Sequence, residues 1–253
     1  MKLGIVTYNI AKDWDVDTII KNCQEIGLDG VEARTTHAHG IEPALSKAQR
    51  AEVRKKFQDS GVKLVGLGSV CEYHSPDPAE LRKQIDETKR FVELAADVGA
   101  DGVKVRPNNL PDEVPVDKTL EQIGVSLREC GEFAKPFGVE IRLEVHGRKT
   151  AHPPHCKTIM DVADHDNVFI CWNSNDSDMD EHGSIDAHFE MLASKIRLVH
   201  ITELWSKYPW RREFELLAQS GYEGYTLAEI QENADPVRLL RFYRALWLAL
   251  QPS

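Results

Sequence analysis

Four short hydrophobic segments in the second half of the chain each end in a polar side chain that can bind a metal ion. These residues are Glu144 in EIRLEVHG, Asn173 in VFICWNSN, His200 in IRLVHITE and Glu229 in GYTLAEI. Two carboxylates, an imidazole and an amide oxygen form an oxygen-rich donor set, which suits a divalent cation better than the thiolates of a structural zinc site do. The pattern predicts one divalent metal ion, with manganese, magnesium or cobalt preferred and zinc as the alternative.

Alternation along these segments predicts that the polar side chains point the same way. Successive side chains of a strand face opposite sides, so Leu143 and Val145 share one face while Glu144 lies on the other. The same alternation separates His200 and Glu229 from their apolar neighbours. If the apolar face packs on helices, the polar side chains converge on the interior.

The elements that must position these residues alternate between extended and helical patterns, eight times each. Extended patterns cover residues 2–9, 30–34, 62–69, 102–107, 140–147, 168–174, 196–203 and 223–230. Helical patterns cover residues 17–27, 46–60, 79–98, 117–137, 155–163, 184–194, 211–220 and 235–250. Glycine, the usual left-handed residue at a helix end, closes several of them, namely at Gly27, Gly61, Gly99, Gly138 and Gly221. Eight such units predict an α/β protein of the closed (β/α)8 TIM barrel class. A doubly wound open sheet is the alternative, but the sequence has no glycine-rich phosphate loop to support it.

Length and composition indicate one globular domain. The 253 residues match the size of a single eight-unit barrel, about 250 residues, and no linker divides them, so residues 1–253 are expected to form one domain. The formal charge of −10 argues against nucleic acid as a partner, because phosphate contacts are made chiefly by lysine and arginine. The sequence does not fix the oligomeric state, and a homo-oligomer stays open.

The amino terminus has no apolar region of the length that an export signal requires. No apolar run approaches the ~20 residues that span a bilayer. A soluble, cytoplasmic protein without a membrane partner is therefore expected. The five cysteines include no Cys-x-x-Cys pair, so we expect reduced, mostly buried thiols.

The loops that follow the strands of such a barrel form its active-site face. The loops at residues 70–78, 146–155 and 173–183 concentrate histidine, aspartate, asparagine and glutamate, whereas the opposite turns are short and bland. The residues that we expect to contact a sugar or polyol substrate are His74, Lys104, His146, Asn175 and Glu203.

The order of these residues resembles the xylose isomerase-like barrel superfamily, in its sugar phosphate isomerase/epimerase branch. The resemblance spans nearly the whole chain and is clearest from residue 140 to 230. It implies that LEVHG places a metal-binding carboxylate at Glu144, HITE the imidazole ligand at His200 and YTLAEI the last carboxylate at Glu229. In the ketose epimerases of that superfamily the two glutamates bind the metal and act as the acid/base pair on a substrate carbon, which implies catalytic roles for Glu144 and Glu229.

This chain departs from the family pattern at the sixth strand. The usual aspartate is Asn173, and the histidine that usually follows three residues later is Asp176. An asparagine offers a carbonyl oxygen but no charge, so metal affinity should fall, or the ion should shift toward Asp176 or Asp178.

The resulting hypothesis is a metal-dependent isomerase or epimerase that abstracts a proton next to a carbonyl of an unphosphorylated sugar or keto-polyol. A lyase or dehydratase acting on an inosose-like or keto-glycoside substrate could use the same residues. A sugar-binding protein that has lost catalysis is a third possibility, suggested by Asn173. The endonuclease branch of the superfamily is disfavoured, because it needs additional histidines and a basic groove.

Structural interpretations compete with each of these assignments. Glu144 could form an ion pair with Arg142 or Lys104 inside the barrel. His200, on an otherwise apolar strand, could be a hydrogen-bonded core histidine. The HPPHC segment at residues 152–156 could bind a separate zinc ion, although its spacing matches no standard zinc motif. The ordered set on four successive strands favours the metal site over these alternatives.

Overall fold

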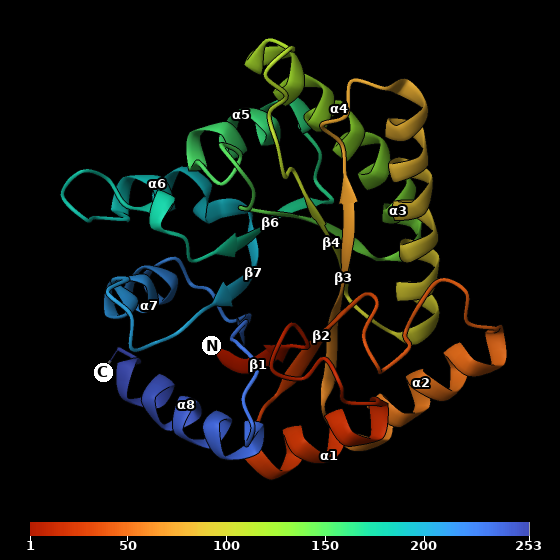
Figure 1. Cartoon of the computed structure of the whole chain (residues 1–253), viewed down its shortest axis with the longest axis vertical. Coiled ribbons are helices and arrows are strands. Elements are labelled where there is room, and N and C mark those ends of the chain that lie inside the picture. Colours follow the sequence, from red (N-terminus) through yellow and green to blue (C-terminus); the bar gives the residue numbers. More distant parts are fainter. Residues whose placement is uncertain (253) are drawn as a thin grey trace.

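The computed structural model describes residues 1–252, whose strands close into a ring surrounded by helices (Figure 1). The strands are β1 (Lys2–Val6), β2 (Gly30–Arg34), β3 (Lys63–Glu72), β4 (Gly102–Arg106), β5 (Glu140–Glu144), β6 (Val168–Asn173), β7 (Ile196–Ile201) and β8 (Tyr225–Ala228). Each strand pairs in parallel with the next, and β8 pairs with β1, so that Ile5 lies opposite Ala228. The closed (β/α)8 barrel class is confirmed, and the open sheet is ruled out.

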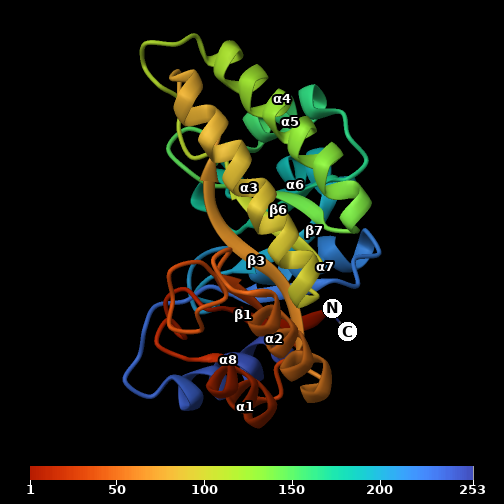
Figure 2. The ribbon, with the colours of Figure 1, turned by 90° about the vertical axis from the view of Figure 1, so that its right-hand side faces the viewer.

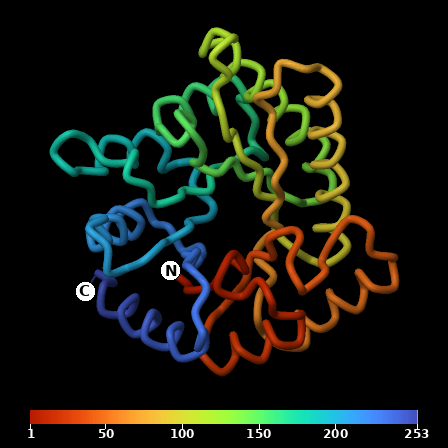
Figure 3. Tube along the Cα trace, viewed as in Figure 1, coloured from red at the N-terminus to blue at the C-terminus, as the bar shows by residue number. Residues whose placement is uncertain are grey.

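Helices cover the outside of the ring and alternate with the strands along the chain. They are α1 (Val16–Ile26), α2 (Lys47–Ser60), α3 (Pro78–Val98), α4 (Val116–Ala134), α5 (Pro153–Ala163), α6 (Asp186–Leu192), α7 (Trp210–Gln219) and α8 (Pro236–Leu250). Short 3-10 turns lie at Lys135–Phe137, Asp176–Asp178 and Ala193–Lys195. Figure 2 shows α3 and α4 lying along one side of the barrel. The trace in Figure 3 follows the chain once around the ring and brings α8 back beside α1.

Local sequence signals explain where the helices begin and end. The Asp15 side chain accepts a hydrogen bond of 2.8 Å from the Thr18 backbone N–H, and Ser46 forms a capping box with Gln49 at the start of α2. Gly27 ends α1 at φ 82° and returns its N–H to the Cys23 carbonyl. All five glycines that the sequence placed after helices have positive φ, so these boundaries were correctly predicted.

Several strands end earlier than their hydrophobic patterns do. The patterns at 2–9, 140–147 and 223–230 extend past the last paired residues Val6, Glu144 and Ala228, because the chain leaves the ladder at the rim and turns into the loops. β3 does the opposite and continues to Glu72, which pairs with Arg106 beyond a register shift. The candidate metal-binding side chains therefore lie at or next to the strand ends.

Two apolar clusters hold the barrel together. A large cluster fills the layer between strands and helices, and a small one lies inside the ring, formed by Val6, Val65, Cys171, Leu198 and Leu227. Each of the five cysteines is buried and carries a free thiol, as predicted. Within residues 1–252, none of the helices combines the length and apolar composition needed to cross a membrane.

Candidate metal centre

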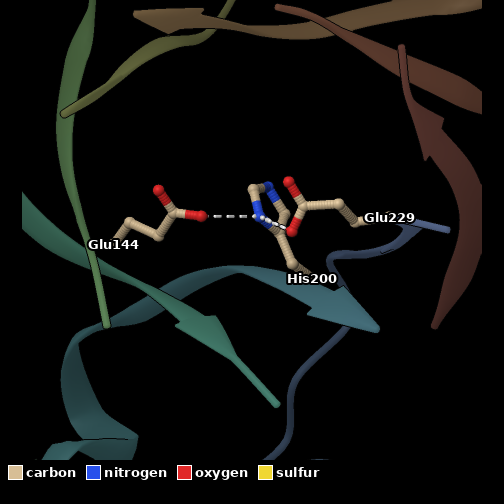
Figure 4. Close-up of side chains that lie close together, drawn as sticks. All are labelled: Glu144, His200 and Glu229. Atoms are coloured by element: carbon tan, nitrogen blue, oxygen red, sulfur yellow. Dashed lines mark ion pairs between the residues drawn. The ribbon is translucent and has the colours of Figure 1, made fainter. Parts of the chain in front are cut away.

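The four residues singled out as metal ligands all lie at the carboxyl ends of neighbouring strands. Glu144 and Asn173 are the last residues of β5 and β6, His200 is the fifth residue of β7, and Glu229 directly follows β8. Strand register pairs Asn173 with His200. Figure 4 shows the side chains of Glu144, His200 and Glu229 pointing toward one another from three elements. The expected convergence at one end of the barrel is confirmed for these three.

Distances within this triad suit one cation. The Nδ1 atom of His200 lies 3.3 Å from Oε1 of Glu144 and 3.5 Å from Oε2 of Glu229. One ligand atom from each residue lies within 4.8 Å of the others, a span that a divalent ion can bridge with bonds of about 2.0–2.6 Å. Glu144 and His200 are buried and Glu229 is partly exposed, so the triad lies at the boundary between the barrel interior and the loops.

Two further charged residues surround the triad. Nζ of the buried Lys104 donates to Oε2 of Glu144 at 2.7 Å, and Oε1 of the buried Glu32 lies 3.4 Å from Nε2 of His200. Three carboxylates and one ammonium carry a formal charge of −2, or −1 when the His200 ring is protonated. A divalent cation that replaced this proton would balance the negative charge, which is costly to bury uncompensated.

The charges of the centre control one another's ionisation. Burial opposes the charged ammonium of Lys104, but the carboxylates of Glu144, Glu32 and Glu229 outweigh it and raise the pKa of Lys104. Burial likewise opposes ionisation of Glu144, but Lys104 and His200 lower the pKa of this carboxyl. Burial also works against a charged His200, yet its neighbours, Cys171 and then Glu32 and Glu229, raise the pKa of the ring well above its ordinary value. Glu144 is thus held as a carboxylate.

Hydrogen bonding leaves specific atoms of the centre without partners. Both ring nitrogens of His200 and both carboxylate oxygens of Glu32 are buried and form no hydrogen bond. Buried polar groups in proteins are almost always satisfied, so a ligand for Nδ1 of His200 is the missing element. The donor set of Glu144, His200 and Glu229 therefore fits a divalent cation.

Asn173 is next to the triad, but it contacts Glu144 through its amide nitrogen, which cannot bind a metal ion as the amide oxygen can. Its Nδ2 donates to Oε1 of Glu144 at 3.3 Å. The following Asn175 uses its amide hydrogens on the carbonyls of Val145 and Asn173. Asn175 therefore fixes the loop, whereas Asn173 can present its oxygen to an ion only after its side-chain amide rotates by about 180°.

The two aspartates of the same loop do not join the triad. Asp176 is exposed, and Asp178 is buried where its Oδ2 accepts hydrogen bonds from the Asn175 backbone N–H at 2.7 Å and the Tyr208 hydroxyl at 3.1 Å. Across residues 1–252, the group able to hold a metal consists of Glu144, His200 and Glu229. This geometry does not favour a shift of the ion toward Asp176 or Asp178, because the hydrogen bonds of Asp178 point its carboxylate away from the triad.

The residues expected to contact substrate lie on β4 or on loops that follow the strands. Lys104 lies inside it, bonded to Glu144. His146 is half-buried with an Nδ1 that has no hydrogen bond, and burial lowers the pKa of its ring. His74 lies 3.7 Å from Glu72, on the loop after β3. Glu203 accepts a 3.0 Å hydrogen bond from the exposed Trp205 indole, on the loop after β7.

Of the competing structural interpretations, the ion pair of Glu144 is present and the separate zinc site is not supported. Glu144 does form an ion pair with Lys104, while Arg142 binds Glu140 lower in the barrel. The thiol of Cys156, in the HPPHC segment, donates to the Thr150 carbonyl at 3.3 Å. That segment forms no metal-holding group within the described chain.

One residue of the centre was missed by sequence reasoning. Glu32 was not predicted to belong to the metal centre, yet it is completely buried beside His200. Alternation within GVEAR does place it opposite Val31 and Ala33, on the inner face of β2. Contact with His200, however, crosses the barrel and leaves no local signal.

Comparison with known proteins supports the fold. A curated relative, inosose isomerase from Halalkalibacterium halodurans, is 24% identical over 193 residues, which cover 69% of this chain and 66% of that protein, just under two thirds of its length. The structure of D-psicose 3-epimerase with D-tagatose from Clostridium cellulolyticum H10 superposes with a TM-score of 0.85 at 18% identity, covering 100% of both chains. The structure of the IOLI protein with a bound zinc atom has a TM-score of 0.76 at 16% identity, covering 99% of this chain and 96% of that one. At these identities the structural matches establish the fold.

A family model establishes the relationship itself. The model for the xylose isomerase-like TIM barrel matches residues 20–246, which include every strand end that carries a triad residue. The implied resemblance is confirmed: the chain belongs to the xylose isomerase-like TIM barrel family.

Proposed function

We propose that this protein is a metal-dependent sugar isomerase or epimerase that moves a proton on a carbon next to a carbonyl. The observation that carries the proposal is the facing pair of Glu144 and Glu229, which approach His200 from two sides of the barrel mouth (Figure 4). Both named enzymes among the relatives described above, an inosose isomerase and a D-psicose 3-epimerase, act on cyclic polyol ketones or ketoses. We therefore propose unphosphorylated ketoses or inososes as the substrate class.

The residues of the centre divide the chemistry among themselves. Removal of a proton beside a carbonyl needs a base within reach of the carbon, and stereochemical inversion needs an acid on the other side. Glu144 and Glu229 fill these roles, and Lys104 keeps Glu144 in the carboxylate form that accepts a proton. Glu144, His200 and Glu229 would hold a divalent cation, which would supply positive charge to polarise the substrate carbonyl and its neighbouring hydroxyl.

Specificity would come from the loops around the centre. We propose that His146, His74 and Glu203 contact substrate hydroxyls, since all three are partly exposed on the loops at the mouth. Lys104 acts through Glu144 as well as on the substrate. Asn175 contributes mainly by holding the loop that carries Asn173, because both its amide hydrogens are bonded to backbone carbonyls.

Metal binding is the direct test of this proposal. Protein purified without chelator is expected to contain about one divalent ion per chain, and calorimetric titration of the chelated protein with Mn²⁺ should show a single site. Solvent deuterium should enter the substrate carbon when the Mn²⁺ protein is incubated with a panel of ketohexoses and inososes. Absence of binding of Mn²⁺, Mg²⁺, Co²⁺ and Zn²⁺ would remove the proposal, and sugar binding without turnover would identify a binding protein instead. A product lacking water, or a released aglycone, would identify a lyase.

Restoring the family aspartate should strengthen the site. Asn173→Asp adds a charged ligand, so we expect Mn²⁺ affinity to rise about tenfold, or about 1.4 kcal/mol of binding free energy. Calorimetry on both proteins measures the difference. Gln219→Glu, at the exposed end of α7, adds the same charge away from the mouth and serves as the control. If Asn173→Asp changes the affinity no more than the control does, residue 173 does not contact the ion.

A further inference from the structure

Glu32 is an unusual residue to find inside a barrel. It is the third residue of β2, its exposed fraction is 0%, and neither carboxylate oxygen forms a hydrogen bond. A buried carboxylate without hydrogen bonds is costly. We therefore expect the groups that Glu32 faces to explain why a glutamate occupies this position.

The neighbouring strand leaves room for this carboxylate. β3 carries glycine at both positions that face it, Gly66 in direct register with Glu32 and Gly68 two residues later. A Cβ atom at Gly68 would lie 2.8 Å from Oε1 of Glu32, closer than side-chain carbons approach such atoms, and one at Gly66 would lie 3.6 Å from Oε2. The pocket that admits the carboxylate is therefore formed by missing side chains on β3.

The group that Glu32 faces is the far side of the metal-binding imidazole. Oε1 of Glu32 lies 3.4 Å from Nε2 of His200, while Nδ1 of the same ring faces Glu144 and Glu229 at 3.3 and 3.5 Å. A histidine ligand generally donates its second N–H to a carboxylate or carbonyl, which fixes the tautomer and the ring orientation. The two nitrogens of His200 have the two environments that this arrangement needs.

We infer that Glu32 is a positioning residue that holds the proton of His200 on Nε2 and thereby aims the Nδ1 lone pair at the ion between Glu144 and Glu229. The inference rests on the proposed metal centre but assigns a role to a residue outside the ligand set. Glu32 faces the Nε2 side of His200, whereas Glu144 and Glu229 face Nδ1, and Lys104 has its own hydrogen bond to Glu144, which leaves the imidazole as the group that Glu32 serves.

Metal affinity tests this role. Glu32→Gln keeps the shape and one acceptor oxygen, and Glu32→Ala removes the partner, so Mn²⁺ dissociation constants should rise about tenfold and about a hundredfold respectively. Gly68→Ala, which crowds Oε1, should also weaken binding. Glu213→Gln changes an equally buried glutamate on α7 and should leave the dissociation constant unchanged. Circular dichroism establishes whether each variant is folded. If Glu32→Ala does not fold, the test rests on Glu32→Gln.

A spectroscopic measurement separates positioning from general loss of structure. In Zn²⁺-loaded protein with ¹⁵N-labelled histidine, the His200 ring should show a proton on Nε2 in the wild type, and this tautomer should lose its dominance in Glu32→Ala. Unchanged affinity of the Glu32 variants, or a wild-type proton on Nδ1, would overturn the inference while the metal centre stands. Wild-type protein that binds no metal would instead overturn both.

Discussion

Glu144→Gln and Glu229→Gln are each expected to lower turnover by about 10²–10⁴-fold, the usual cost of losing a general base or acid. An amide keeps the shape of the carboxylate but cannot accept the proton from carbon. Both residues also belong to the triad around His200, so the metal content of each variant must be measured alongside its rate. The informative result is a variant that holds its metal, has lost turnover and no longer exchanges the carbon-bound hydrogen of the substrate with deuterated solvent.

The matched control is Glu140→Gln on the same strand. Glu140 begins β5 at the opposite end of the barrel, where it binds Arg142, so this variant should retain turnover and exchange. Metal-loaded triad variants that still exchange hydrogen at the wild-type rate would remove the acid/base assignment. Turnover by the wild type without any solvent exchange would point to a hydride shift between carbons, with the glutamates acting only as ligands.

The second large effect is expected in stability, at a pair of buried acids behind the metal centre. Asp178 and Glu213 are both fully buried; Asp178 accepts hydrogen bonds from the Asn175 backbone N–H and the Tyr208 hydroxyl, and Glu213 accepts one from the Ser174 hydroxyl. Burial raises the pKa of Asp178 from 3.8 to about 8, and burial together with the charge of Asp178 raises that of Glu213 from 4.5 to about 8. The folded protein therefore keeps two protons that the unfolded chain releases near pH 4.

The sign of the pH dependence follows from these shifts. Between pH of about 4 and 8 the unfolded chain binds fewer protons than the folded one, so each acid lowers stability as pH rises, by up to about 1.4 kcal/mol per pH unit. Glu213→Gln removes one such group. The free energy of unfolding of the variant should be close to that of the wild type near pH 5 and should exceed it by a few kcal/mol near pH 8. Urea unfolding across this range measures the difference.

Groups that do not interact with Glu213 titrate equally in both proteins, so the difference between them reports Glu213 together with its coupling to Asp178. Glu215→Gln changes an exposed glutamate of the same helix, paired with Arg212, and should leave the pH dependence as it is. Parallel stability curves for Glu213→Gln and the wild type would show that Glu213 is ionised in the folded protein.

Local signals explain why the fold and the triad could be predicted. Strand alternation, helix periodicity and a glycine such as Gly27 after a helix depend on neighbouring residues, and the repeated order of such units defines a barrel. The ends of successive parallel strands must meet at one face, so the positions of Glu144, His200 and Glu229 in the sequence were enough to bring them together. The strand limits were less certain, because apolar patterns continue past the last backbone pairing.

What the sequence did not reveal depends on contacts across the barrel. Glu32 meets His200 only when β2 and β7 face each other inside the ring, and the space for it depends on Gly68 of another strand. The burial of Asp178 likewise depends on Tyr208, 30 positions away. The separation of two residues along the sequence does not show how close they lie across the barrel. The same applies to Asn173, whose amide orientation is set by Glu144.

The burial of every cysteine makes this barrel suitable for site-specific labelling. Burial raises the pKa of Cys23 and Cys130 to about 12 and that of Cys171 to about 11, so little reactive thiolate forms at neutral pH. A maleimide reagent in solution therefore finds no accessible thiol in the folded chain between residues 1 and 252. A single cysteine introduced at Trp205, 78% exposed on the loop after β7, would carry a fluorophore alone and could report sugar binding at the mouth without removal of any native thiol.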